Sequence, residues 1–164
     1  MVISKEIRKK LDEYAPKYYS SNTEERKNIC RKLNIDTFGG DCIGNGSGRN
    51  VFDMSVMGYP KLALKLAKPN DEYDGVKQNK HEIKLWNVLN SEQKTYLAPV
   101  LESGINNYWL IMPKGKPRPP VNYNWLDDAI YYLQDYVWGD DIQRENIARI
   151  NNELKICDYG TPPQ

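Results

Sequence analysis

The sequence predicts an α+β protein with helices at its N-terminus, an antiparallel sheet in its middle and a β-hairpin near its C-terminus. Three patterns support this prediction. Apolar residues recur at helical spacing between residues 3 and 33. Short apolar runs separated by Gly, Asn and Pro fill residues 42–67 and 97–113, as in an antiparallel meander. The pair Asn151-Asn152 separates two further short apolar runs, which predicts a hairpin.

Length and composition narrow the function classes. The chain has 164 residues, enough for one domain or for two small lobes that share a core. Lys and Arg total 23 against 22 Asp and Glu, so bulk charge does not suggest nucleic-acid binding. No apolar run approaches the ~18 residues of a membrane span. Three cysteines without metal-ligand spacing suit a reducing compartment, so we expect a cytoplasmic protein.

Residues 1–36 are expected to form a helical extension. Ile3, Ile7, Leu11, Tyr14 and Tyr18 share one face of a helix over residues 3–19, which Pro16 would bend or end. A second helix is predicted to start after Ser21-Asn22-Thr23 and to run to about residue 33. The extension would serve as a docking element for a partner or a membrane surface, or would simply pack on the sheet that follows. Packing is the simpler expectation.

Residues 37–113 are predicted to form a five-stranded antiparallel lobe with one helix. Its first two strands flank a glycine-rich turn that contains Gly44, Gly46 and Gly48. Glycines let a backbone approach a phosphate closely, although such a turn is more often only a hairpin. Val51 follows the turn, where an apolar side chain would cover a base.

A lysine and a glutamate in this lobe are candidates for an ion pair. Lys65 lies in the apolar strand after Gly58-Tyr59-Pro60 and shares a face with the small Ala63, which leaves room for a ligand. Glu82 borders the apolar stripe Ile83, Trp86 and Leu89 of a helix predicted over residues 76–89. Taken alone, an edge-strand lysine and a solvated glutamate are the simpler interpretations. The only histidine, His81, is expected at the surface.

Two more strands and a linker complete the middle of the chain. Residues 97–104 and 108–113 read as strands joined by an Asn-Asn turn, and Met112 lies near the end of the second. The proline-rich run 113–120 is predicted to be a stiff linker, with a polyproline recognition segment as the alternative. One amphipathic helix is predicted over residues 123–137.

The last part of the chain, residues 114–164, carries the polar residues best suited to chemistry. A hairpin over residues 147–157 would bring Asn146 and Asp158 side by side, with Asp141 on the loop before them. Two carboxylates and an amide supply oxygen ligands of the kind that Mg²⁺ prefers. Such a group suits phosphoryl transfer, in which one Asp meets a hydroxyl nucleophile and the others hold metal.

These patterns together resemble the protein-kinase-like superfamily. Asp141-x4-Asn146 resembles its catalytic loop, Asp158-Tyr159-Gly160 its Asp-Phe-Gly motif, and Leu62-Ala63-Leu64-Lys65 its Val-Ala-Ile-Lys strand. The motifs occur in the family order over residues 43–160, and the chain is most similar to short kinase-like proteins of bacteriophages and archaeal viruses. The resemblance implies a kinase-like small lobe over 37–113 and a strongly reduced helical large lobe over 114–164.

The resemblance also implies a role for each residue that matches a family motif. Asp141 would be the catalytic base, with Lys65 on the α- and β-phosphates and Glu82 orienting Lys65. Asn146 and Asp158 would hold Mg²⁺. The ATP site would further comprise the following residues: Gly44, Gly46, Gly48, Val51, Ala63 and Met112.

The sequence departs from the family pattern in ways that leave two functions open. The third glycine comes one position early, Gly139-Asp140 replaces the usual His-Arg, and Gln143 replaces a lysine. Only four residues follow Gly160, so the peptide-binding activation segment of protein kinases is not expected. One interpretation is an ATP- and Mg²⁺-dependent phosphotransferase in the cytoplasm, of a host if the protein is viral. The alternative is a kinase-shaped binding module, such as a viral inhibitor of a host protein.

Overall fold

The computed structural model describes residues 2–35 and 42–161. The α-helices are α1 (Lys5–Ser20), α2 (Thr23–Lys32), α3 (Gly75–Val88), α4 (Ser91–Lys94) and α5 (Tyr123–Leu133). The strands are β1 (Cys42–Asn45), β2 (Arg49–Asp53), β3 (Leu62–Ala67), β4 (Glu102–Ser103), β5 (Trp109–Pro113), β6 (Lys116–Pro117), β7 (Ile147–Ile150) and β8 (Glu153–Ile156). Three 3-10 helices are η1 (Ser55–Met57), η2 (Gly139–Asp141) and η3 (Arg144–Asn146).

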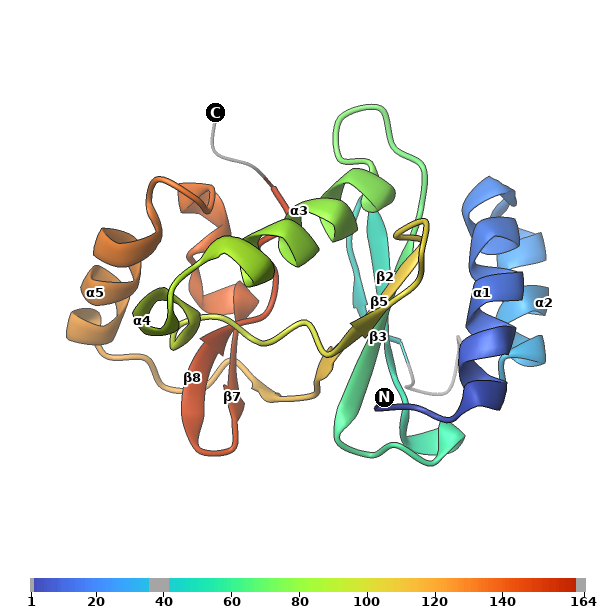
Figure 1. Ribbon diagram of the computed structural model, residues 1–164, viewed down its shortest axis with the longest axis horizontal. Coiled ribbons are helices and arrows are strands. Elements are labelled where there is room, and N and C mark those ends of the chain that lie inside the picture. The colour runs from blue at the N-terminus through green and yellow to red at the C-terminus, as the bar shows by residue number, and fades with distance from the viewer. Residues whose placement is uncertain (1, 36–41, 162–164) are drawn as a thin grey trace.

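A five-stranded antiparallel sheet forms the centre of the fold, which confirms the predicted α+β class (Figure 1). Its strand order is β1-β2-β3-β5-β4, and α3 lies between β3 and β4 in the chain. Because side chains alternate along a strand, Leu64 and Leu66 of β3 point to one face while Ala63 and Lys65 point to the other. The sheet therefore separates a mainly apolar layer from a layer that contains the candidate site.

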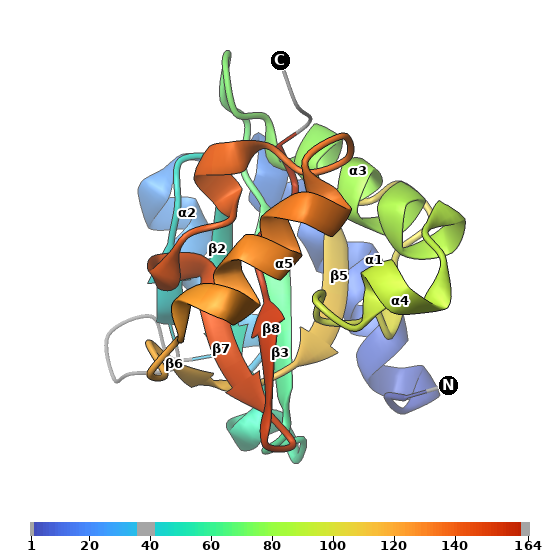
Figure 2. The ribbon, with the colours of Figure 1, turned by 90° about the vertical axis from the view of Figure 1, so that its left-hand side faces the viewer.

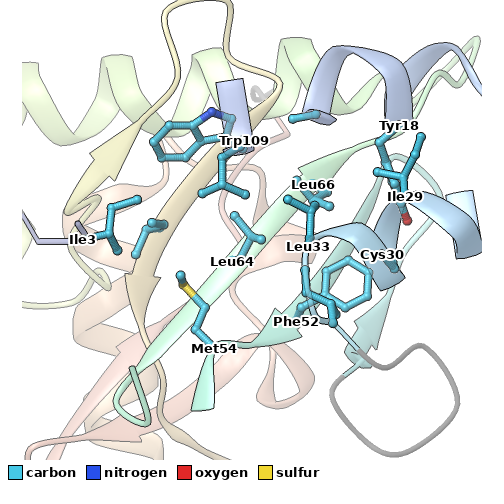
Figure 3. Close-up of a cluster of buried hydrophobic side chains, with 14 of the residues drawn as sticks. Ile3, Tyr18, Ile29, Cys30, Leu33, Phe52, Met54, Leu64, Leu66 and Trp109 are labelled. Atoms are coloured by element: carbon cyan, nitrogen blue, oxygen red, sulfur yellow. The ribbon is translucent and has the colours of Figure 1, made fainter. Parts of the chain in front are cut away.

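The N-terminal helices α1 and α2 cover the apolar face of the sheet (Figures 1 and 3). Ser4 caps α1 by accepting a hydrogen bond from the amide of Ile7, and Asn22 forms a capping box at the start of α2. Leu11 and Tyr18 are buried against the β-strands in one cluster with Phe52 and Trp109. The expectation that these helices pack on the sheet is confirmed, and α1 continues four residues past Pro16 without ending there.

On the opposite side of the sheet lie α3 and the C-terminal hairpin, with α5 beyond the hairpin (Figures 1 and 2). A second core joins them, and it includes Leu85, Leu110, Leu133, Ile156 and Tyr159. The hairpin of β7 and β8 forms as predicted around Asn151-Asn152, whose φ angles of 49° and 70° suit a two-residue turn of type I′. The candidate residues near Lys65 and those near the hairpin thus face one another across this core.

Several sequence expectations were wrong in detail. The proline-rich run does not form a free linker throughout, because Lys116 and Pro117 pair with β7 as strand β6. Of the strand predicted over 97–104, only β4 pairs with β5, while Leu97 makes an isolated bridge to Ile156. The helix predicted to reach residue 137 ends at Leu133. Strand β6 and Ala98 bond to distant parts of the chain, whereas the amides of Gln134, Tyr136 and Val137 bond to the preceding turn.

The buried stripe of α3 also differs from the predicted one. Glu82, Leu85 and Leu89 are buried, whereas Ile83 and Trp86 are only half-buried. The boundary predicted between residues 36 and 37 lies outside the described residues. Within the described ranges, no helix has both the length and the apolar character needed to cross a membrane.

Candidate functional site

A buried ion pair joins the central strand of the sheet to α3. Nζ of Lys65 lies 2.8 Å from Oε1 of Glu82, and the two residues are only 4% and 0% exposed. Lys65 points to the α3 side because its position in β3 alternates with Leu64 and Leu66. Glu82 reaches it from the buried stripe of α3. The structure therefore brings together the lysine and glutamate that the sequence singled out.

Glu82 has a second cationic partner, Arg49, which the sequence analysis did not select. Nη2 of Arg49 lies 3.0 Å from Oε1 of Glu82 and forms a second, very close ion pair with Asp158. Arg49 is 3% exposed, and its Nη1 donates a hydrogen bond to Oδ1 of Asn79. The alternation of side chains along a strand could have predicted its position, because Arg49 lies two residues before Val51 and so shares its face.

The chain makes room for the Arg49 side chain at Gly160. A Cβ atom at that position would lie 2.8 Å from Nη2 of Arg49. Glycine at this point of the Asp158-Tyr159-Gly160 segment therefore lets the guanidinium pack directly on the backbone. The buried charges of the site form a compact group of two cations, Arg49 and Lys65, with two carboxylates, Glu82 and Asp158.

The segment after β8 is held against this group by its backbone. Nζ of Lys65 donates a hydrogen bond to the carbonyl oxygen of Cys157 and lies 3.7 Å from Oδ1 of Asp158. The amide of Tyr159 donates a hydrogen bond to Oε1 of Glu82, and the buried hydroxyl of Tyr159 donates one to the carbonyl oxygen of Ala98. These bonds fix Asp158 beside the Lys65–Glu82 pair, with about half of its side chain still exposed.

The predicted hairpin brings Asn146 next to the Asp158 segment. The amide of Cys157 donates a 2.7 Å hydrogen bond to the carbonyl oxygen of Asn146. The side-chain Nδ2 of Asn146 donates to the carbonyl of Asp141, so the loop before the hairpin is tied to its first residue. Oδ2 of Asp141 in turn accepts a hydrogen bond from the amide of Thr161. Asp141, Asn146 and Asp158 thus gather at one end of the hairpin.

The two carboxylates at this end ionise differently. Burial, followed by the negative charge of Asp158, raises the pKa of Asp141 to about 6. Burial opposes ionisation of Asp158 as well, but the charges of Arg49 and Lys65 outweigh it, so its pKa lies below the usual value. Asp158 is therefore a stable carboxylate, while Asp141 is the better proton acceptor near neutral pH.

The glycine-rich turn is fixed by contacts with neighbouring segments of the chain. Gly46 donates its amide to the carbonyl of Arg49, closing the β1–β2 turn. A Cβ atom at Gly48 would collide with the backbone carbonyl of Tyr73, whereas one at Gly46 would find ordinary contacts. Nζ of Lys68 binds the carbonyl of Gly46. Gly48 is thus required for close packing of two backbones, and a role of the turn in phosphate binding remains a prediction.

The remaining predicted contacts to a nucleotide line up on the Lys65 face of the sheet. Val51 is paired with Lys65 across β2 and β3, and Ala63 is paired with Met112 across β3 and β5. Directly paired residues of antiparallel strands point to the same face. Gly44 belongs to β1, where a Cβ atom would touch the Val51 side chain at 3.3 Å. The sheet therefore places Val51, Ala63 and Met112 on the same face as Lys65.

The oxygen donors fit a magnesium ion only in part. Among the described residues, no three His, Cys, Asp or Glu side chains are grouped so as to hold a metal. Asp158 offers a half-exposed carboxylate, and Oδ1 of Asn146 accepts no hydrogen bond from the residues that the structure describes. Mg²⁺ commonly binds one or two protein oxygens together with substrate phosphates. The donor set therefore suits a magnesium ion that arrives with a nucleotide.

Comparisons with known proteins assign no family to this arrangement. No protein-family model matches the chain, and the curated proteins contain no match to it.

Proposed function

We propose that the chain binds ATP with Mg²⁺ and transfers the terminal phosphoryl group to a hydroxyl acceptor. The observation that carries this proposal is the buried Lys65–Glu82 pair, with Asp158 only 3.7 Å from the lysine. The order of a strand that carries the lysine and a helix that carries its glutamate supports it, because kinase sites pair a strand lysine with a helix glutamate. Lysine, glutamate and aspartate in this setting position phosphates without covalent chemistry.

The nucleotide would lie along the Lys65 face of the sheet. Val51, Ala63 and Met112 supply the apolar surface for the base, and Lys65 neutralises phosphate charge while Glu82 holds its side chain in place. Asp158 and Asn146 would hold Mg²⁺. The ion they hold would supply positive charge against the phosphate oxygens.

Asp141 is the candidate general base. Its raised pKa of about 6 leaves it mostly ionised at neutral pH, yet basic enough to accept the proton of an attacking hydroxyl. The amide of Thr161 orients one of its oxygens. Because Asp158 keeps a lowered pKa, the two carboxylates separate into a proton acceptor and a permanently charged metal ligand.

Arg49 gives the site a cation beyond those of the family motifs. In the described arrangement it neutralises Asp158, so binding of a metal by Asp158 requires this ion pair to loosen. A freed guanidinium would lie beside the phosphates, where its planar donors bind phosphate oxygens well. Under this proposal Arg49 exchanges a carboxylate partner for a phosphate partner when nucleotide binds.

The same arginine favours the second candidate function, a kinase-shaped binding module. A carboxylate that is already paired with Arg49, and that also neighbours Lys65, needs no metal to balance its charge. In that case the buried charges serve structure, and the chain acts through a protein partner of a host or a virus. The two candidates differ in whether Asp158 releases Arg49 when MgATP is present.

A transfer assay tests the proposal and separates the two functions. Native protein is incubated with ATP labelled in its terminal phosphate, and label is followed into water, into the protein itself and into a panel of hydroxyl compounds. Asp141→Asn should abolish transfer, whereas the adjacent and exposed Asp140→Asn should retain it. Transfer that survives in Asp141→Asn would refute the assigned base. Native protein that binds MgATP without transferring label would be the binding module.

A further inference from the structure

A basic pocket lies on the outer side of α3, next to the segment that follows Asp158. It has a volume of about 310 Å³ and is lined by Lys77, Lys80, His81 and Lys84 together with Gly160 and Thr161. The four α3 residues follow the spacing i, i+3, i+4 and i+7, which places them on one face of the helix. This face is opposite to the one that carries Glu82 into the core.

The three lysines retain positive charge for a ligand. The lysine salt bridges found within residues 2–35 and 42–161 involve other lysines, so Lys77, Lys80 and Lys84 have no acidic partner there. They span about 10 Å along the helix axis, the length of a small anionic molecule.

Two acidic residues also line the pocket, but both are engaged elsewhere. Asp74 accepts hydrogen bonds from the amides of Val76 and Lys77 through Oδ1 and from the Tyr19 hydroxyl through Oδ2. Glu72 is hydrogen bonded to the Tyr73 side chain. Hydrogen bonds to neutral groups leave both carboxylates charged, so three lysines against two carboxylates give the pocket a net charge of +1.

The histidine adds a neutral polar group to the pocket. Nε2 of His81 lies 3.3 Å from the carbonyl oxygen of Tyr136. Burial lowers the pKa of His81 below its usual value, so it is mainly neutral at pH 7. The lysines alone supply the positive charge, and binding of an anion should therefore change little between pH 7 and 8.

The pocket is one hydrogen bond away from the candidate base. Thr161 lines it, and the amide of Thr161 donates to Oδ2 of Asp141 at 3.2 Å. A molecule whose anionic group is bound by the lysines would extend over Gly160 and Thr161 toward Asp141. This placement distinguishes the pocket from an ordinary lysine-rich helix surface.

We propose that this pocket binds the anionic group of the phosphoacceptor, and that the acceptor is a small hydroxyl compound that already bears a phosphate. The acceptor role rests on the proposed function, whereas anion binding by the pocket does not. The volume suits a ligand of this size, and the lysines suit phosphate oxygens.

Inorganic pyrophosphate without Mg²⁺ or nucleotide is the probe for the pocket. In an NMR titration of the full chain, it should shift the amides of Lys77, Lys84 and Thr161 in a saturable way. Replacing the three pocket lysines by glutamine (Lys77→Gln, Lys80→Gln, Lys84→Gln) should weaken this binding at least about tenfold, because each lysine contributes a charge contact. Glutamine has a helix propensity close to that of lysine, so α3 should remain folded.

A matched triple variant controls for net charge. Lys5→Gln, Lys9→Gln and Lys61→Gln remove the same charge from exposed positions and should leave pyrophosphate binding unchanged. If both triple variants bind pyrophosphate equally well, the pocket is not the anion-binding site. Binding that is lost in Lys65→Met but kept in the pocket variant would overturn the assignment as well, since the anion would then occupy the nucleotide site.

The acceptor role is tested separately with a panel of phosphorylated hydroxyl compounds and labelled ATP. The pocket variant should raise the KM for the acceptor at least about tenfold and leave the KM for ATP unchanged. An unchanged acceptor KM would overturn the acceptor assignment. Absence of ATP binding by the native chain would instead overturn the proposed function, while the pyrophosphate result would still decide whether the pocket binds anions.

Discussion

Glu82 should be the most costly residue of the buried charge group to neutralise. It is fully buried, and its Oε1 contacts Lys65, Arg49 and the amide of Tyr159 at 2.8, 3.0 and 3.1 Å. Glu82→Gln keeps the shape but leaves two buried cations facing only the half-exposed Asp158. Removing one partner of a buried ion pair costs about 3–5 kcal/mol, because the other charge stays uncompensated.

Neutralising Lys65 should cost less. In Lys65→Met, Glu82 retains Arg49 as a partner. Arg49 then faces two carboxylates, but one of them, Asp158, is half-exposed to solvent. The free energy of unfolding should therefore fall by about 1–3 kcal/mol, the contribution of the charge-assisted hydrogen bonds that Lys65 donates. The asymmetry between Glu82→Gln and Lys65→Met is the quantity that the geometry predicts.

Urea unfolding of the two variants measures this asymmetry. With a slope of about 2 kcal/mol per molar urea, a loss of about 4 kcal/mol lowers the midpoint by about 2 M. The exposed Glu145→Gln is the matched control and should change stability by less than about 0.5 kcal/mol. If Glu82→Gln costs no more than Lys65→Met, Glu82 does not serve two cations and the assigned network is wrong.

Three further predictions follow from single residues. The folded pKa of Asp141 is about 6 against 3.8 for the ordinary group. Its contribution to stability is therefore present below pH 4 and is lost as the pH rises through 6. Asp141→Asn should be more stable than native protein by up to about 3 kcal/mol at pH 8, but not at pH 3.5. Denaturant unfolding at the two pH values measures this difference. Gly48→Ala should lower the melting temperature by several degrees because its Cβ would strike a backbone carbonyl, while Gly46→Ala should change it little; equal effects would contradict the packing role. Tyr159→Phe should cost about 1–2 kcal/mol, since it leaves the buried carbonyl of Ala98 without its donor, and a neutral result would show that water replaces the hydroxyl.

The sequence predicted best those features that depend on neighbouring residues. The turn at Asn151-Asn152 fixes the register of β7 and β8, and this register alone places residue 146 beside residue 157. The alternation of Lys65 with leucines fixed its face of the sheet. The start of α2 next to Asn22 followed from its capping side chains. Local chemistry was sufficient for each of these elements.

Features that depend on distant contacts were missed. Arg49 is buried only because Glu82 and Asp158, which are far away in sequence, converge on it, and an arginine after a glycine turn is ordinarily solvent-exposed. Strand β6 forms in a proline-rich run because β7 offers an edge to pair with. Leu97 bridges Ile156 instead of extending β4 for the same reason. Tertiary partners determined these outcomes, and the local pattern indicated only the face of β2 on which Arg49 lies.

The central claim is that Lys65 and Asp158 belong to an MgATP site. Thermal unfolding of native protein, Lys65→Met and Asp158→Ala, each with and without millimolar ATP and Mg²⁺, tests it directly. A ligand at about 100 times its Kd adds about 2.7 kcal/mol, which raises the melting temperature by about 5–10 °C in a domain of this size. The account predicts this rise for native protein and for the exposed control Lys61→Met, and none for the two site variants. No rise in native protein, or an equal rise in Lys65→Met, would contradict it.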